Sequence, residues 1–463
     1  MFLLSGQSLF GQAGPAPITA PTDREKILSV LPVVETMLKQ FATENHIPGY
    51  AFGLVYKGEL LGKWASGYAN LDTKTPASTT TMFRIASMSK SFTALAILRL
   101  RDEGKIKLDD PVATYVPALQ NQGLTADAAP ITIRDLLTHS AGFPEDNPWG
   151  DRQLEDKAED LLALLQSGVS FSTATGTAYE YSNLGYALLG LIIEKTTGLN
   201  YGEYIRTHVW KRLGMQAAWE FSLVPKNQLA LGYRWEKNQW VQQPLLHDGI
   251  YGAMGGMITS VESFAPYMAL HLGAWPPRDE AGSAYFNRSS IREMQQAWRF
   301  NNLNPSFKYG SGPTCPKVSA YGYGLRIDTD CQQRTFVGHS GGLPGFGSNW
   351  NILPAHGLGV VLLANATYAP TSAWNLRILD TVLALTQLKP MAPQASAILL
   401  QRQKELQAFL PHWNGAVNAP IFAENFFPDY GIENLREQCK TIFQALGQNL
   451  VWGPMEAENA LRG

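Results

Sequence analysis

The segment Ser87-Met88-Ser89-Lys90 is the feature whose residue types and spacing point most directly to chemistry. A lysine three positions after a serine, at the start of a helix, places its amine one turn above the hydroxyl on the same face. The helix N-terminus stabilises negative charge on the serine oxygen, and a lysine in an apolar, cation-rich pocket can act as its base. The pattern occurs once in the chain and predicts a serine nucleophile. The alternative is a helix cap beside a solvated lysine.

Tyr181-Ser182-Asn183 supplies a second set of polar groups directly before a predicted apolar helix. A tyrosine in that loop can project its hydroxyl into a cleft and move protons, and the asparagine amide can hold a substrate carbonyl or amide. The same spacing recurs at Tyr68–Asn70 and Tyr285–Asn287. At those two places we expect turn-forming asparagines beside packed aromatic rings.

A glycine-flanked His-x-Gly, His339-Ser340-Gly341, follows a short apolar strand pattern. Glycines allow a substrate backbone to lie close to the strand. The N–H of Gly342 can then join that of Ser87 in binding an oxyanion. A second His-x-Gly, His247-Asp248-Gly249, has no strand before it, and we interpret it as structural.

Three strings of sequence carry a resemblance to a known family: Phe83–Lys90, Leu136–Gly142 and Gly338–Phe346. With these elements in this order, the chain from about 23 to 388 resembles the serine β-lactamase and penicillin-binding-protein superfamily. The resembling branch contains class C β-lactamases, D-Ala-D-Ala carboxypeptidases, D-aminopeptidases and esterases. The resemblance implies an α+β, β-lactamase/transpeptidase-like fold, an antiparallel sheet flanked by helices with a helical subdomain at about 105–220.

The resemblance also implies roles for the site residues. Ser87 would be acylated, Lys90 would be its base partner, and Tyr181 would act as general base or acid. Asn183 would contact the substrate amide, while Gly341 and Gly342 would line the oxyanion and substrate-binding strand. His139, in the second string, is expected to be structural.

His339 departs from the β-lactamase pattern, because it stands where those enzymes carry the lysine of Lys-Thr-Gly. A neutral imidazole is a weaker anchor for a carboxylate than an ammonium group. The departure favours a D-peptidase, carboxypeptidase or esterase over an efficient β-lactamase, although a class C-type β-lactamase stays open. The substrate is expected to be a small molecule or peptide, and the sequence leaves the choice of substrate open.

Hydrophobic periodicity predicts the elements that position these residues. Apolar residues at intervals of three and four predict helices at 23–46, 88–102, 131–138, 157–166, 183–197 and 375–385. Alternating and β-prone runs predict a hairpin of 51–56 and 60–65, and later strands at 321–327, 334–338, 346–353 and 358–364. Strands therefore open and close the chain around a helical middle, an α+β order in which distant segments complete one sheet.

The predicted domain organisation has three parts. Residues 1–22 carry no charge and begin with an apolar stretch, which resembles the back half of a secretory signal peptide. That favours a periplasmic or secreted protein, with an ordinary flexible terminus and a cytoplasmic location left open. Residues 23–390 form the catalytic domain, and 391–463 form an extension of unknown role with helices at 398–410 and 432–446.

Composition limits the classes of function. Of 463 residues, 45% are hydrophobic and 16% charged, which supports a large core. The net charge of −2 argues against nucleic-acid binding through phosphate contacts. No run of eighteen apolar residues predicts a transmembrane span. The oligomeric state is left open.

Cysteine and histidine usage points to no cofactor or metal. The chain has three cysteines, of which Cys315 and Cys331 have a spacing that suits a disulfide. The eight histidines show no metal-ligand spacing.

Two further hypotheses compete with this interpretation. Gly338–Gly342 also matches the G-x-S-x-G nucleophile elbow of α/β-hydrolases, with Ser340, Asp380 and His412 in the required order. However, an elbow must lead into a helix, and Pro344-Gly345 does not. The second is a catalytically inactive scaffold on the same fold. A fluorophosphonate probe separates the three, because it would label Ser87, Ser340 or neither.

Overall fold

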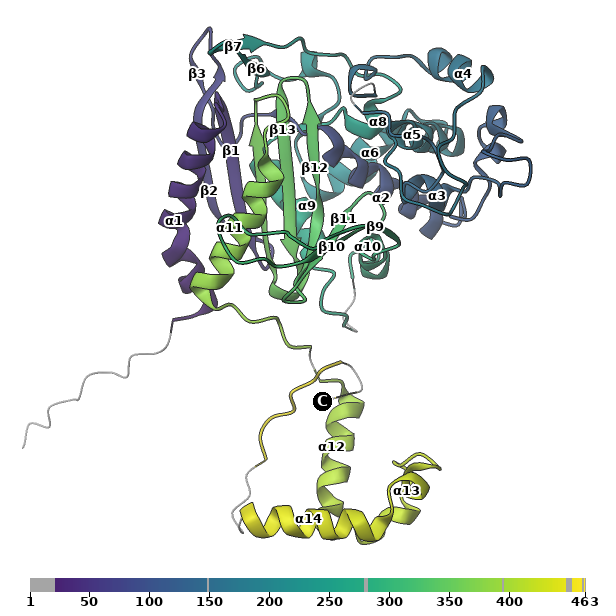
Figure 1. Ribbon diagram of the computed structural model, residues 1–463, viewed down its shortest axis with the longest axis vertical. Coiled ribbons are helices and arrows are strands. Elements are labelled where there is room, and N and C mark those ends of the chain that lie inside the picture. The colour runs from purple at the N-terminus through teal and green to yellow at the C-terminus, as the bar shows by residue number, and fades with distance from the viewer. Residues whose placement is uncertain are drawn as a thin grey trace, which may run out of the picture.

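The computed structural model describes residues 21–147, 150–278, 282–393, 395–446, 452–459 and 462 (Figure 1). The signal-like segment lies almost wholly outside these residues, so its role stays a prediction. Within the described part of the chain, no helix has both the length and the apolar character needed to cross a bilayer.

The described residues build a nine-stranded antiparallel sheet in the order β3-β2-β1-β14-β13-β12-β11-β10-β9. Strand β1, near the N-terminus, pairs with β14, about three hundred residues later, with Tyr50 opposite Ala364. The expectation that distant segments complete one sheet is therefore confirmed. The strands are β1 (Gly49–Tyr56), β2 (Glu59–Asn70), β3 (Thr75–Pro76), β9 (Arg299–Asn304), β10 (Lys317–Tyr321), β11 (Arg326–Asp330), β12 (Thr335–Leu343), β13 (Phe346–Leu353) and β14 (Leu358–Ala364).

Helices α1 (Asp23–Glu44) and α11 (Thr371–Thr386) cover one face of the sheet (Figure 1). All residues of strand β1 are buried, so both faces of the sheet are covered at this strand. Its Phe52 and Leu54 pack in the cluster under α1 and α11, whereas Ala51 and Val55 pack in the cluster on the other face. Two-residue periodicity in a strand produces this division.

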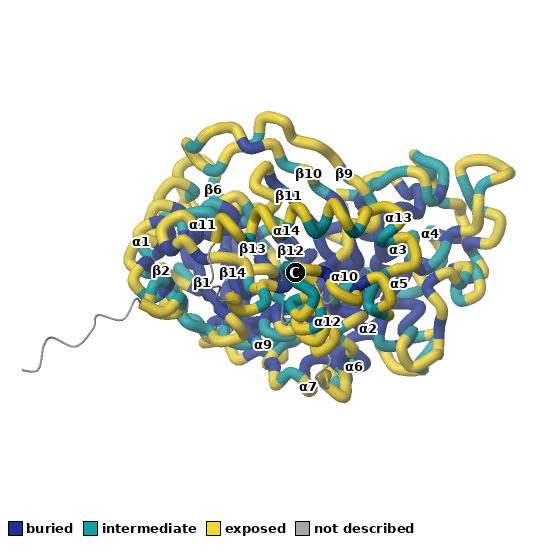
Figure 2. Tube along the Cα trace, turned by 90° about the horizontal axis from the view of Figure 1, so that it is seen from below, coloured by how far each residue is buried: buried dark blue, intermediate teal, exposed yellow. Residues whose placement is uncertain are grey.

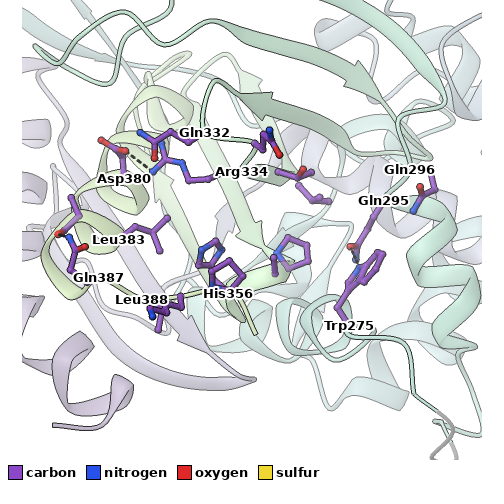
Figure 3. Close-up of a pocket in the computed structure, with 18 residues that line it drawn as sticks. Trp275, Gln295, Gln296, Gln332, Arg334, His356, Asp380, Leu383, Gln387 and Leu388 are labelled. Atoms are coloured by element: carbon purple, nitrogen blue, oxygen red, sulfur yellow. Dashed lines mark hydrogen bonds and ion pairs between the residues drawn. The ribbon is translucent and has the colours of Figure 1, made fainter. Parts of the chain in front are cut away.

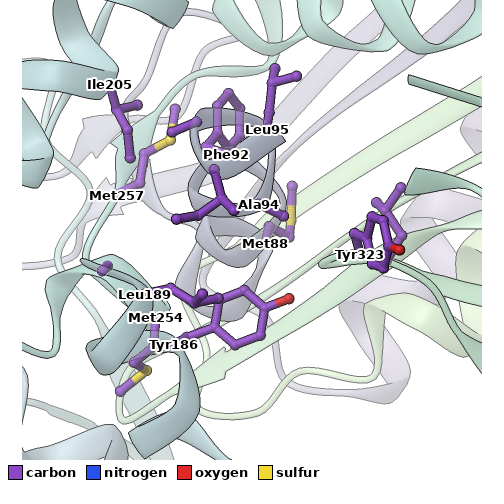
Figure 4. Packing of buried hydrophobic residues seen from close by; sticks show 14 of the residues in the cluster. Met88, Phe92, Ala94, Leu95, Tyr186, Leu189, Ile205, Met254, Met257 and Tyr323 are labelled. Carbon is purple, nitrogen blue, oxygen red and sulfur yellow. The ribbon is translucent and has the colours of Figure 1, made fainter. Parts of the chain in front are cut away.

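The second face carries the larger core, which is built around α2 (Ser89–Asp102). Figure 4 shows Phe92, Ala94 and Leu95 of this helix among side chains from α5 (Asn183–Thr197), including Tyr186 and Leu189. Since all but a few residues of α2 are buried, its first turn is held firmly. The other helices are α3 (Ile133–Leu137), α4 (Ala158–Gln166), α6 (Tyr201–Ile205), α7 (Lys211–Leu213), α8 (Gly252–Gly255), α9 (Val261–Leu272) and α10 (Arg288–Met294).

Short strands outside the main sheet connect the helices. They are β4 (Phe83–Arg84), β5 (Ala217–Ala218) and β8 (Ile258–Thr259) in one small sheet, and β6 (Tyr233–Glu236) with β7 (Gln239–Gln242) in a hairpin. The backbone N–H of Ile85 donates to the carbonyl of Met257 at 3.0 Å. The segment leading to the predicted nucleophile is thus tied to the helical part of the molecule.

Three predicted strands are wrong in their bounds, and the first is 60–65, because β2 runs five residues further, to Asn70. The predicted strand 321–327 is instead the end of β10, a turn at 322–325 and the start of β11, because Gly324 takes a φ of 68° and the N–H of Gly322 donates to the carbonyl of Leu325 at 2.8 Å. Strand β12 runs five residues beyond the predicted end at 338, through the glycines that appear in the sequence as a turn. Cys315 and Cys331, whose spacing suits a disulfide but left the bond open, are bonded to each other.

The C-terminal extension contains α12 (Ala397–Phe409), α13 (Phe426–Asp429) and α14 (Ile432–Leu446). Figure 1 shows these helices below the sheet, and Figure 2 shows α14 with largely exposed residues. Aromatic rings of Trp413, Phe422 and Phe426 pack against one another in this extension. The division at 390 and the helical subdomain at 105–220 stay predictions.

Candidate active site

Ser87 lies in a single 3₁₀ turn, η1 (Ala86–Met88), immediately before α2. Ala86 has a φ of 48°, which is unfavourable for a residue with a Cβ. The turn is held by the hydroxyl of Ser89, which donates to the carbonyl of Ala86 at 2.7 Å. Backbone strain of this kind persists only where the surroundings fix it, and it is often found at active sites.

Lys90 is fully buried, and its ammonium group faces Ser87. Nζ lies 3.1 Å from Ser87 Oγ, 2.7 Å from Asn183 Oδ1 and 2.9 Å from the carbonyl oxygen of Met254. Burial lowers the pKa of Lys90 to about 7, because the charged form is poorly solvated there. The predicted one-turn spacing therefore yields a direct contact between an amine that can lose its proton and a serine hydroxyl.

The Tyr-Ser-Asn segment is positioned by the N-terminus of α5. Both oxygens of the Asp146 carboxylate accept backbone N–H groups there, from Asn183 and Leu184, each at 2.8 Å. A carboxylate is stabilising at a helix N-terminus. The Asn183 side chain then contacts Lys90 through Oδ1 and Asn147 through Nδ2 at 2.5 Å. The structure thus brings Asn183 to the lysine. Asn183 is fully buried and is not among the residues that line the cleft, so its contact with the substrate stays a prediction.

Tyr181 is buried with its ring beside the lysine, whose Nζ is 4.8 Å from the ring centroid. Burial raises the pKa of Tyr181 well above its usual value, and a hydrogen bond with Ser87 opposes that shift only in part. The phenol therefore stays protonated near neutral pH. It can donate a proton but is a poor base in the resting enzyme.

Strand β12 offers an unpaired edge to these groups. Its partner β11 begins at Arg326 opposite Gly338, so in the described part of the chain no strand pairs with the outer edge of residues 339–343. Leu343 and Phe346 flank the two-residue turn to β13 and form a hydrogen-bonded pair, so Gly342 falls in the next, non-bonded pair. Its N–H accordingly points to the open edge, as an oxyanion donor must.

His339 is buried on β12 and uses both ring nitrogens within the protein. Nε2 lies 2.9 Å from the hydroxyl of Tyr321, and Nδ1 lies 2.5 Å from the carbonyl oxygen of Ser340. Burial, followed by the charges of Arg326 and Lys90, holds the pKa of His339 well below its usual range. In the neutral ring, Nδ1–H donates to the carbonyl and Nε2 accepts from the tyrosine, because a carbonyl oxygen can only accept.

A cavity of about 290 Å³ is lined by four of the predicted residues, Ser87, Tyr181, His339 and Gly342, whereas Lys90, Asn183 and Gly341 lie outside its lining. It also contains residues that the sequence interpretation missed. Arg326 lies over the Tyr181 ring at 5.7 Å, and its buried Nε has no hydrogen-bond partner among the described residues. A charged residue within an apolar strand pattern could have drawn attention to it. The lining is Ser87, Asn147, Asp151, Tyr181, Arg326, His339, Ser340, Gly342 and Tyr368.

Gly341 lies where the sheet meets the nucleophile turn. A Cβ at this position would lie 2.2 Å from the carbonyl oxygen of Ile85 and 2.5 Å from Ser348 Oγ. We expect Gly341→Ala to lower the free energy of unfolding by about 1–3 kcal/mol and to reduce turnover by displacing Ser87. Urea denaturation and initial rates measure the two effects. The control is Gly185→Ala, where the nearest atoms lie 3.8 Å away; an equal loss there would contradict the prediction.

The nucleophile-elbow hypothesis is wrong. Ser340 lies inside β12, and the chain continues through a hairpin into β13 rather than into a helix. Asp380 instead forms an ion pair with Arg334 at 2.8 Å, near the start of β12. Ser340 does line the cleft, but the described residues show no Asp–His pair beside its hydroxyl.

The remaining histidine motifs have structural surroundings. His139 is buried, and its Nδ1 accepts the backbone N–H of Ser182 at 3.2 Å, as expected for a structural residue. In the second His-x-Gly, Asp248 Oδ1 accepts from the Tyr201 hydroxyl at 2.7 Å. Among the described residues, no group of three or more His, Cys, Asp or Glu side chains is arranged to hold a metal ion.

A larger cavity, of about 790 Å³, lies near the start of β12 (Figure 3). Trp275, Arg334 and His356 are among its lining residues, and none of the predicted site residues is. Size alone therefore does not identify the active site of this chain; the Ser87–Lys90 contact does.

The sheet, the buried serine–lysine pair and the open strand edge together place the protein among the serine β-lactamases and penicillin-binding proteins, as the resemblance implies. A family model described as Beta-lactamase matches residues 34–383. The chain belongs to this family, whose members are generally serine hydrolases.

Known proteins resemble this chain at moderate identity. Protein flp of Staphylococcus aureus (strain MRSA252) is 30% identical over 352 residues, covering 73% of this chain and 64% of flp. Penicillin-binding protein 4* of Bacillus subtilis (strain 168) is 28% identical over 310 residues, covering 62% of each chain. The match therefore spans less than two thirds of the length of these relatives.

Solved structures give the same fold. The octameric penicillin-binding protein homologue from Pyrococcus abyssi aligns with a TM-score of 0.65 and 27% identity, covering 81% of both chains. EstCE1, a hydrolase with promiscuous acyltransferase activity, aligns with a TM-score of 0.61 and 22% identity, covering 77% of this chain and 99% of its own. The second similarity shows the fold alone.

Proposed function

We propose that this protein is a serine hydrolase that forms a covalent acyl-enzyme on small amides and esters, with short carboxylate-terminated D-peptides as its preferred substrates. The observation that carries the proposal is the 3.1 Å contact between Lys90 Nζ and Ser87 Oγ. A nucleophile and a base within hydrogen-bond reach are what covalent acyl transfer requires.

The proposed reaction has two steps. Ser87 Oγ attacks the substrate carbonyl while the neutral amine of Lys90 accepts its proton, and the N–H groups of Ser87 and Gly342 bind the oxyanion. The bond to the leaving group breaks, and the hydroxyl of Tyr181 passes a proton to that group. Water then attacks the ester carbon, transfers a proton to the same groups, and releases the acid and free Ser87.

The position of Arg326 is evidence that the leaving group of the substrate carries a carboxylate. Arg326 is partly buried in the cleft and its Nε is unpaired among the described residues; burial disfavours its charge, and the carboxylate of Asp328 acts against that cost. Guanidinium groups bind carboxylates through two parallel hydrogen bonds. His339 beside it is neutral, so Arg326 would supply the positive charge that the lysine of Lys-Thr-Gly supplies in β-lactamases.

Arg326→Gln tests this assignment by comparing two substrates, a D-alanyl-D-alanine peptide and its C-terminal amide. We expect the ratio of kcat/KM for the acid to that for the amide to fall about 10- to 100-fold, the value of one charge-assisted interaction. Arg326→Lys, which keeps the charge without the planar fork, should recover part of the ratio. An unchanged ratio in Arg326→Gln would contradict the assignment.

The main alternative, a class C-type β-lactamase, is tested by a panel of a D-alanyl peptide, a p-nitrophenyl ester and a penicillin. The absence of a lysine at His339 leads us to expect the peptide and the ester to turn over faster than the penicillin. The reverse order would favour the alternative, and no turnover with no fluorophosphonate adduct would favour a scaffold.

A further inference from the structure

Asp151 is a buried carboxylate in the active-site cleft that the proposed reaction does not use. It is 4% exposed and lines the same cavity as Ser87. Its Oδ2 accepts a hydrogen bond from the hydroxyl of Tyr368 at 2.9 Å. Among the described residues, no lysine, arginine or histidine forms an ion pair with it.

Burying an ionised carboxylate costs free energy unless a positive charge is paired with it. Burial raises the pKa of Asp151 above its usual value, which shows that its negative charge is poorly solvated. The Tyr368 hydrogen bond and the charges of Lys90 and Arg152 oppose that shift only in part. Lys90 itself is occupied by Ser87, Asn183 and Met254. The cleft therefore contains an anionic group with room for a cation from outside the protein.

The position of Asp151 relative to Arg326 is set by β12. Arg326 stands opposite Gly338, whereas the Tyr368 ring packs on Gly342, where a Cβ would lie 2.5 Å from its Cδ1. The two glycines are four positions apart along the strand, a distance of about 13 Å. The cleft thus has a cationic end at Arg326 and an anionic end at Tyr368 and Asp151, with Ser87 lining the space between them.

We propose that Asp151, held by Tyr368, binds the free α-ammonium group of the residue whose carbonyl group acylates Ser87. The substrate class is then a zwitterionic dipeptide or similarly short peptide, with its ammonium group at Asp151 and its carboxylate at Arg326. A cavity of about 290 Å³ lies just below the usual range for ligand sites, roughly 300–1,000 Å³, which favours short substrates. This inference rests on the proposed function.

The chemistry of such a substrate balances without a further reactant. The Ser87 Oγ–carbonyl bond forms and the peptide C–N bond breaks, and the serine proton leaves on the departing amino acid. Water then splits the ester, which restores Ser87 and releases the second amino acid. Asp151 gains and loses no bond in either step, so it is a specificity residue.

The test compares D-alanyl-D-alanine with N-acetyl-D-alanyl-D-alanine, which lacks the ammonium group. We expect the wild-type enzyme to prefer the free dipeptide by about 10- to 100-fold in kcat/KM, and Asp151→Asn to remove most of that preference. Asp156→Asn, a substitution in the same loop but outside the cleft, should leave the preference intact. Tyr368→Phe keeps the carboxylate but loses its hydrogen bond, and should give a smaller loss.

Two results would overturn the inference. One is a wild-type enzyme that does not prefer the free amine; the other is an equal loss on both substrates in Asp151→Asn, which would assign the carboxylate to Lys90. Labelling of Ser87 by a fluorophosphonate separates these from failure of the proposed function. An adduct with ester turnover but no amine preference contradicts only the inference, whereas the absence of an adduct contradicts the proposed function. If Asp151→Asn does not fold, Tyr368→Phe decides the question.

Discussion

Replacing Ser87 with alanine is expected to reduce turnover of every substrate by at least about 10³-fold, the order of loss when a catalytic nucleophile is removed. The reason is that Ser87 Oγ is the cleft hydroxyl in contact with a base, at 3.1 Å from Lys90 Nζ. The measurement is initial rates on a D-alanyl peptide and a p-nitrophenyl ester. Fluorophosphonate labelling should fail in the same variant.

The fold is expected to survive this substitution. Lys90 keeps its hydrogen bonds to Asn183 and Met254 when the serine hydroxyl is lost, so the change in free energy of unfolding should be about 1 kcal/mol or less. Ser91→Ala is the matched control, because it removes a buried hydroxyl from the same helix whose partner is the carbonyl of Met88. Near-normal turnover in Ser87→Ala, or an adduct mapped to Ser340, would contradict the proposed mechanism.

The parts of the site that lie close together in sequence are the parts that local spacing predicts. Ser87 and Lys90 are related by one helical turn, and the Tyr181–Asn183 segment is related to its helix by a capped N-terminus. Both relations depend on helix geometry and not on tertiary packing. The contact between the two segments, from Lys90 to Asn183, requires the packing of α2 on α5.

Strand β12 shows where sequence patterns mislead. A run of glycines favours a turn, and that expectation ended the predicted strand at Gly338. In the structure, a Cβ at position 341 would collide with the carbonyl oxygen of Ile85, and a Cβ at position 342 would collide with the ring of Tyr368. Only glycine fits at either position. The glycines accommodate residues far away in sequence, so local patterns could not distinguish a crowded strand from a turn.

Arg326 and Asp151 could not be assigned from the sequence for a related reason. They reach the cleft from β11 and from a loop before α4, separated by about 175 residues, and no motif spacing connects them. Their roles as the two charged ends of the cleft depend on β12, which lies between them. The catalytic pair thus follows from local structure, whereas the residues proposed to select the substrate follow from the topology of the sheet.

Replacing Lys90 with methionine is expected to reduce kcat/KM by about 10²- to 10⁴-fold, the usual contribution of a general base. Methionine preserves most of the buried volume but cannot accept the serine proton. Lys90→Arg is the more demanding variant, because it retains the positive charge while a guanidinium stays protonated at all working pH values. We expect both variants to be impaired, and turnover near the wild-type level in Lys90→Arg would show that the charge, and not proton transfer, is what the reaction needs.

The pH dependence provides an independent test of the same role. Burial lowers the pKa of Lys90 to about 7, so the amine is protonated and inactive as a base below that pH and neutral above it. We therefore expect kcat/KM of the wild-type enzyme to fall about tenfold for each pH unit below 7 and to level off above it. Lys90→Met should lose this limb of the profile, whereas Ser91→Ala should keep it. A wild-type profile that is flat from pH 5 to 8 would show that another group accepts the Ser87 proton. Lys90 would then only hold the Ser87 hydroxyl in place.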